Sequence, residues 1–164
     1  MIIILRLLHI LSGATWFGAL IVVAFFLMPS IGAAGAAGGA VMKQMGDRKY
    51  SQFMMALLAL TILSGAALMY YDNKAFGGNW YATGMGRTIS LGAAAAIVAA
   101  VLGAVGARPT MNKMQELGGQ MAGGGTADQQ AQMKALQGKM LMTTRIVAGL
   151  LILAASTMAV ARYM

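Results

Sequence analysis

One histidine lies inside the first apolar stretch of the chain and is its strongest candidate for chemistry. His9 is the only histidine among the 164 residues, and it lies within residues 2–28, a stretch long enough to cross a bilayer. An imidazole inside a membrane span is rare and is by default a functional hypothesis. The ring can ligate haem, a chlorin or copper, and Gly13, one turn away on the same helix face, leaves room for a flat macrocycle. The alternative is that His9 hydrogen-bonds a neighbouring helix or a lipid headgroup.

A tryptophan follows two helical turns later. Trp16 lies about 21 Å along the predicted helix from its start, near the middle of the membrane. Tryptophan is usually enriched at the membrane surface instead. We therefore expect Trp16 to pack against protein or to face a partner, and stacking on a cofactor is the alternative.

Sulfur and oxygen ligands give little further support for a reaction. The chain has 16 methionines and no cysteine, and its predicted spans contain no carboxylate. Thioethers suit copper(I), but many of the methionines recur at helical spacing and are better explained as filling of a helix interface. Those expected to line such an interface are Met111, Met114, Met121, Met133 and Met140. The sequence predicts that the protein is not an enzyme, and its first expectation is no cofactor, with haem, a chlorin or copper at His9 as alternatives.

The composition is that of a membrane protein. Hydrophobic residues make up 59% of the chain, the mean hydropathy is +0.72, and only 10% of the residues are charged, against about a quarter in soluble domains. The net charge of +8 comes from residues between the apolar stretches, which is the pattern of membrane topology and not of nucleic-acid binding. The expected partners are therefore the lipid bilayer and other membrane proteins, with no nucleic acid.

Four apolar stretches predict a single all-α membrane domain over residues 1–164. The spans are expected at about 2–28, 53–71, 88–107 and 141–161, packed as a four-helix bundle. Small and hydroxyl residues let membrane helices approach closely. Those expected at helix contacts are Gly13, Ser64, Gly65, Gly92, Ala96, Ala99 and Gly103.

The pattern of residues from about 110 to 140 predicts a helical hairpin outside the membrane. Pro109 is expected to end or kink the third span, since proline cannot donate the helical hydrogen bond. Residues 123–125 are three glycines, and Thr126 followed by Gln129 is a capping-box pattern, so a new helix should start there. Its two arms are expected to pack through the methionines named above.

The distribution of basic residues predicts the orientation. Eight of the 12 lysines and arginines lie in the first and third loops and four on the other side. Basic loops stay in the cytoplasm. We therefore expect a multi-pass membrane protein with a cytoplasmic hairpin and both termini on the opposite side of the membrane. A repeat, Ile-Leu-Ser-Gly-Ala at 10–14 and 62–66, indicates either a duplicated helix pair or chance.

The first 45 residues resemble a family. The run of residues 5–19, with His9 followed by Trp16-Phe17-Gly18, and the closing Met28-Pro29, resembles a group of uncharacterised bacterial four-helix membrane proteins similar to the copper-resistance D domain. The resemblance implies four helices, a copper or haem association at His9 and a location in the bacterial inner membrane, where both termini would be periplasmic. The further histidines that a copper-moving site would need are not in this chain.

The leading hypothesis for the function is non-catalytic. Abundant small-residue faces, a mid-span tryptophan and a projecting hairpin are typical of a small accessory subunit of a larger membrane complex, respiratory or photosynthetic complexes being one setting. The alternatives are a cofactor-binding membrane protein that uses His9 and, third, copper-related transport.

Overall fold

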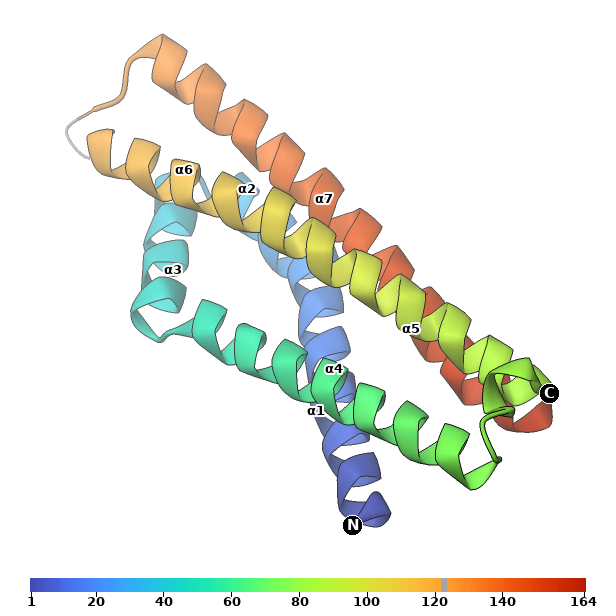
Figure 1. The fold of residues 1–164 in the computed structure, drawn as a ribbon. Helices are drawn as coiled ribbons and strands as arrows, with labels where there is room; N and C mark the ends of the chain where they lie inside the picture. Colours follow the sequence, from blue (N-terminus) through green and yellow to red (C-terminus); the bar gives the residue numbers. More distant parts are fainter. Residues whose placement is uncertain (122–123) are drawn as a thin grey trace.

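The computed structural model describes residues 1–121 and 124–164, and all regular structure in these two ranges is helical (Figure 1). Four helical segments are long and apolar enough to cross a membrane: Ile2–Ala33, Tyr50–Ala75, Gly84–Gln120 and Ala127–Tyr163. The predicted all-α class and the number of apolar helices are therefore confirmed. These helices are compatible with a multi-pass membrane protein.

The first segment passes through a proline without ending. It consists of α1 (Ile2–Val22), a π-helical turn (Val23–Leu27) and α2 (Met28–Ala33). A proline ring clashes with the carbonyl four residues earlier in a regular helix. The wider π turn relieves this clash, and the Met28 N–H donates to the Val23 carbonyl five residues back. The helix therefore continues beyond Pro29, where the sequence predicted its end.

A short helix and a tight corner lie between the first segment and the second. α3 (Ala36–Asp47) and α4 (Tyr50–Ala75) meet at Lys49, which adopts a left-handed φ of 58°. After α4, a loop and a 3-10 turn (Trp80–Ala82) lead to α5. Thr83 caps α5, because its side chain accepts a hydrogen bond from the Gly86 N–H.

The third segment also contains a π turn directly before a proline, as the first segment does. It consists of α5 (Gly84–Leu102), a π turn (Gly103–Ala107) and α6 (Arg108–Gln120). The Arg108 N–H donates to the Gly103 carbonyl, directly before Pro109. α5 and α6 consequently follow one nearly straight course in Figure 1, so Pro109 does not end the helix.

The last segment is α7 (Ala127–Val160), which closes with a 3-10 turn (Ala161–Tyr163). The predicted capping box is confirmed, because the Gln129 N–H donates to Thr126 Oγ1 at 3.2 Å and the Thr126 N–H donates to Gln129 Oε1 at 2.9 Å. α6 lies beside the first half of α7 (Figure 1). Part of the predicted glycine turn between them, Gly123, lies outside the described residues.

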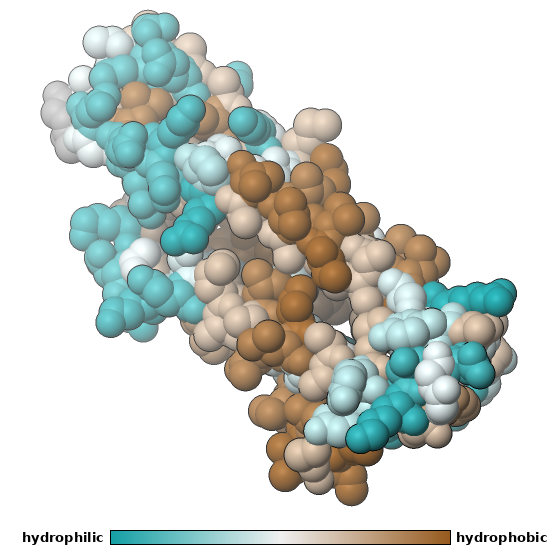
Figure 2. Space-filling view, in the orientation of Figure 1, coloured by the Kyte–Doolittle hydropathy of each residue, from teal (hydrophilic) through white to brown (hydrophobic). Residues whose placement is uncertain are grey.

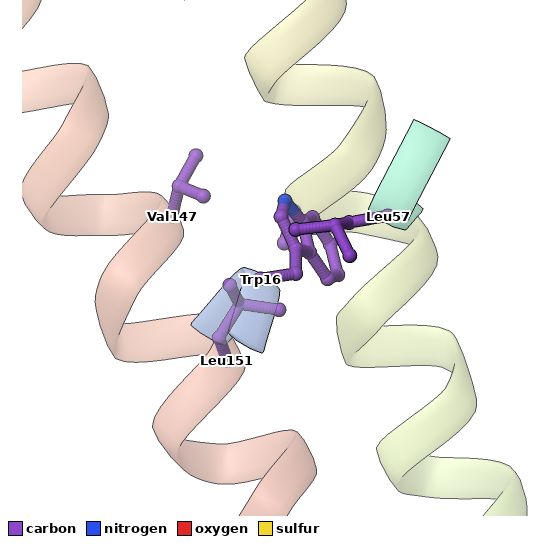
Figure 3. Packing of buried hydrophobic residues seen from close by; sticks show 5 residues of the cluster. Trp16, Leu57, Val147 and Leu151 are labelled. Atoms are coloured by element: carbon purple, nitrogen blue, oxygen red, sulfur yellow. The ribbon is translucent and has the colours of Figure 1, made fainter. Parts of the chain in front are cut away.

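The helices form two antiparallel pairs. α1 packs along α4, and α5 packs along α7, whereas contacts between the two pairs are sparse. The pairs meet around Trp16 of α1, which lies among Leu57 of α4 and Val147 and Leu151 of α7 (Figure 3). Apolar side chains cover much of the outer surface between two hydrophilic ends (Figure 2).

Candidate functional site

The His9 ring lies in the contact between α1 and α4. Its Nδ1 is 2.9 Å from the main-chain oxygen of Thr61. A carbonyl oxygen only accepts, so Nδ1 carries the ring proton and the lone pair of a neutral ring is on Nε2. The ring is half-buried, and it fits because position 65 is glycine: a Cβ there would stand 2.8 Å from the His9 Cε1.

Three hydroxyl groups surround this contact. Thr61 Oγ1 is 2.9 Å from Ser12 Oγ on the opposite helix, and Ser12 Oγ donates to the Leu8 carbonyl at 2.6 Å. The Ser64 hydroxyl donates to a carbonyl of its own helix, that of Leu60. Each hydroxyl is therefore satisfied within the protein, which matters where lipid offers no hydrogen bonds. The cluster joins α1 to α4 through polar contacts within two of the apolar helical segments.

The sequence repeat is the contact surface of this helix pair. In the structure, the residue before each repeat also belongs to the contact. The two matching segments are then His9-Ile-Leu-Ser-Gly on α1 and Thr61-Ile-Leu-Ser-Gly on α4. Gly65 receives His9, and a Cβ at Gly13 would stand 3.4 Å from the Thr61 Cγ2. Each glycine thus faces the residue that precedes the other glycine by one turn. Because the helices are antiparallel, equal motifs meet in a reciprocal way.

Trp16 lies two turns further along α1, in the centre of the molecule. Its side chain is 6% exposed and belongs to one buried cluster with Leu57, Ala99, Val147 and Leu151. Figure 3 shows the indole between α4 and α7. The structure therefore places Trp16 against protein from three other helices.

The other small residues predicted at helix contacts lie in different surroundings. Gly92 is buried against Ala154, Thr157 and Met158 of α7, and Ala99 is fully buried. Ala96 is partly buried beside the Trp16 cluster. Gly103 differs, because no atom in the described part of the chain lies within 4 Å of the position of its missing Cβ.

The predicted hairpin methionines lie along α6 and α7. Met140 is buried, and Met111, Met114, Met121 and Met133 are half-buried. The Met133 Cε is 3.9 Å from where a Cβ of Gly118 would stand, which brings the two arms into contact. Leu117 of α6 is also buried. These contacts describe packing between helices, and none of them assembles a set of sulfur ligands.

The charged side chains of the described residues do not form a metal-binding cluster. Arg6 and Asp72 lie 3.8 Å apart at one end of the α1–α4 pair. Residues 1–121 and 124–164 hold no group of three His, Cys, Asp or Glu side chains that could bind a metal ion. Any ligand at His9 would therefore have a single imidazole from this chain.

Sequence reasoning did not bring two residues of this site, Ser12 and Thr61, together with His9. Ser12 and Thr61 complete the cluster at His9, and the match between His9-x-x-Ser-Gly and Thr61-x-x-Ser-Gly is the signal that could have found them. Comparison of the chain with protein-family models, curated proteins and solved structures finds no match.

Proposed function

We propose that the chain is a non-catalytic accessory subunit of a larger complex in the bacterial inner membrane, with respiratory or photosynthetic assemblies as one setting. The observation that carries this proposal is a helix face with small residues that none of the residues described by the structure covers. The face lies on α7, the helix with the largest buried share of its apolar stretch, 39% against 22%, 11% and 17% in the other segments.

The uncovered face runs along α7 at helical spacing. Gly149 is exposed, and apart from its own stretch of helix nothing in the described residues lies within 4 Å of the position of its missing Cβ. Met142, Arg145, Ile152 and Ser156 are exposed on the same side of the helix. Glycine costs a helix about 1 kcal/mol relative to alanine and gains nothing against lipid. Glycine on such a face instead allows the backbone of another helix to approach closely.

The hydrophilic end supports the same proposal. α6 and the first half of α7 extend the molecule at the end opposite the two termini (Figure 1). The side with more basic residues includes this hairpin, and we place it in the cytoplasm for that reason. Both termini are then periplasmic. A hairpin of this kind can contact the soluble parts of a neighbouring subunit.

The test is a native gel of the chain solubilised from its own membrane with a mild detergent. We expect the wild-type chain to migrate in a band far larger than its 17.0 kDa. Gly149→Leu should release it to the size of the free chain, because the larger side chain prevents close helix approach. Ala14→Leu, the same kind of change at an exposed position of α1, should leave the large band unchanged. A wild-type chain that runs alone as a stable monomer contradicts the proposal.

A second candidate is a membrane protein that binds haem, a chlorin or copper through His9. It is favoured by the Nδ1 contact with the Thr61 carbonyl, since ligating histidines usually donate their other ring N–H to such an oxygen. The residues fit one axial ligand of a macrocycle better than a copper site, which needs more ligands than this cluster offers. Haem or a chlorin would supply redox or light-absorbing chemistry. The chain itself would hold and orient the ring.

The expected result for this candidate is an absorption band that stays with the isolated chain. His9→Ala should abolish the band, and Trp16→Phe, which keeps an aromatic residue in the core, should retain it. A colourless wild-type chain that still enters the large native band excludes haem and a chlorin and leaves the first candidate, and metal analysis of the same sample tests for copper, since copper(I) has no visible band. A visible-range spectrum of both variants and the wild type decides on haem and a chlorin.

A further inference from the structure

We propose that a groove between α4 and α5 binds one anionic phospholipid, with an acyl chain in the groove and the phosphate at a basic end. This site is separate from His9 and from the outward face of α7. It does not depend on the accessory-subunit proposal, because a lipid can occupy the groove in the free chain as well as in a complex.

The groove is apolar and lies between the two helix pairs. It has a volume of about 330 Å³. It is lined by Met55, Leu58, Ala59, Ile62, Leu63 and Ala100. The α4 part of this lining extends about 12 Å along the helix axis, close to half of the roughly 30 Å hydrocarbon core. One acyl chain of a single leaflet therefore fits its length.

The arrangement of the helix pairs keeps the groove open. α4 and α5 make few contacts with each other, and the pairs are joined mainly around Trp16. Figure 2 shows a recess between brown, hydrophobic side chains in the middle of the molecule, with hydrophilic side chains toward the upper left end. A recess without polar lining does not hold ordered water. In a membrane, the acyl chain of a lipid is the apolar group that can fill this recess.

On the α5 side, backbone hydrogen bonds show that Arg108 lies further along the same side of the helix as the groove. The Gly103 N–H donates to the Ala100 carbonyl, and the Arg108 N–H donates to the Gly103 carbonyl. These bonds stack Ala100, Gly103 and Arg108 along the helix, and Arg108 is about 12 Å from Ala100 in rise. The space beside Gly103 is open, so the apolar path continues toward the arginine.

On the α4 side, the corner before the helix brings two more cations to the same end. Arg48 and Lys49 directly precede α4, and Lys49 is about 9 Å from Met55 in helix rise. The corner touches α6, because a Cβ at Gly46 would stand 3.7 Å from the Gln115 Nε2. The basic end of the groove, defined here as Arg48, Lys49 and Arg108, is therefore built from both sides.

The charge balance at this end favours an anion. Asp47, the nearest carboxylate in sequence, pairs with Lys43 at 3.0 Å. Among the residues that the structure describes, no carboxylate lies within 4 Å of the side-chain nitrogens of Arg48, Lys49 or Arg108. All three are exposed. Cations next to an apolar groove match a phosphodiester with an acyl chain, and a headgroup without its own amine matches them best.

The experiment is native mass spectrometry of the purified chain with dioleoyl phosphatidylglycerol or dioleoyl phosphatidylcholine added. We expect a one-lipid adduct with a preference of roughly tenfold or more for phosphatidylglycerol, given three cations near the phosphate. The triple variant R48Q/K49Q/R108Q should bind both lipids equally. The control K74Q/R87Q/R162Q removes three charges at the other end and should keep the preference.

A groove variant tests the acyl chain. Ala59→Phe, which fills the groove, should weaken binding of both lipids, whereas Ala94→Phe at an exposed position of α5 should not. Thermal unfolding confirms that each variant is folded, and if Ala59→Phe is not, the two triple variants decide. Equal wild-type binding of the two lipids overturns the proposal, as does equal loss in both triple variants. A two-chain species in place of the lipid adduct also overturns it, because a second copy would then fill the groove.

Discussion

Replacing Trp16 with alanine is expected to separate the two helix pairs while each pair stays intact. The indole is the largest side chain of the cluster that joins α1 and α4 to α7, and contacts between the pairs elsewhere are sparse. Truncating a buried aromatic residue costs about 3–5 kcal/mol in soluble proteins. We expect about 3 kcal/mol here, because lipid also solvates the apolar groups after separation.

Distances between spin labels measure this separation directly. The chain has no cysteine, so pairs of cysteines can be introduced for labelling without background. Labels at Ser51 and Ala131 report on the distance between the two pairs, and their distribution should broaden in the Trp16→Ala variant. Labels at Ile3 and Lys74 lie within the first pair and should keep their distance. Leu11→Ala, at a 64% exposed position of α1, is the control, and an unchanged Ser51–Ala131 distribution would refute the prediction.

The second large effect is expected at Gly65. A methyl group at this position would stand 2.8 Å from the His9 Cε1, closer than real Cβ contacts. The ring cannot move away freely, because its Nδ1 contacts the Thr61 carbonyl. Overpacking of this kind typically costs 1–3 kcal/mol. We therefore expect Gly65→Ala to lower the free energy of unfolding by about 2 kcal/mol.

A double-mutant cycle isolates the cause of this loss. In a His9→Ala background the obstructing ring is gone, so Gly65→Ala should no longer destabilise the chain, because alanine is the better helix former. The expected coupling is then about 2 kcal/mol or more. Gly18→Ala is the matched control, since nothing lies within 4 Å of its missing Cβ. Unfolding in detergent mixtures measures all four states of the cycle. An equal cost of Gly65→Ala with and without His9 would show that the ring is not the obstacle.

Features that depend on local chemistry could be predicted from the sequence. Hydropathy is a property of each stretch alone, and it predicts four apolar helices. The capping box at Thr126 needs only residues three positions apart, and it is present. Both features arise within one element, so no knowledge of its neighbours was needed.

Features that arise between elements could not be predicted in the same way. Pro29 and Pro109 were expected to interrupt helices, but a π turn before each proline absorbs the clash, and packing against α7 accompanies both turns. The role of the repeat at Gly13 and Gly65 requires knowing that α1 and α4 are antiparallel.

The length of α7 has a mechanical consequence. It is a single helix of 34 residues without a proline or a widened turn, which corresponds to a rod of about 51 Å. One end forms an arm of the hairpin, and its middle carries Val147 and Leu151 beside Trp16. A helix without a break transmits a tilt along its whole axis. A tilt at the N-terminal end of α7 is therefore transmitted to the junction of the two helix pairs, and α7 acts as a lever whose pivot is beside Trp16.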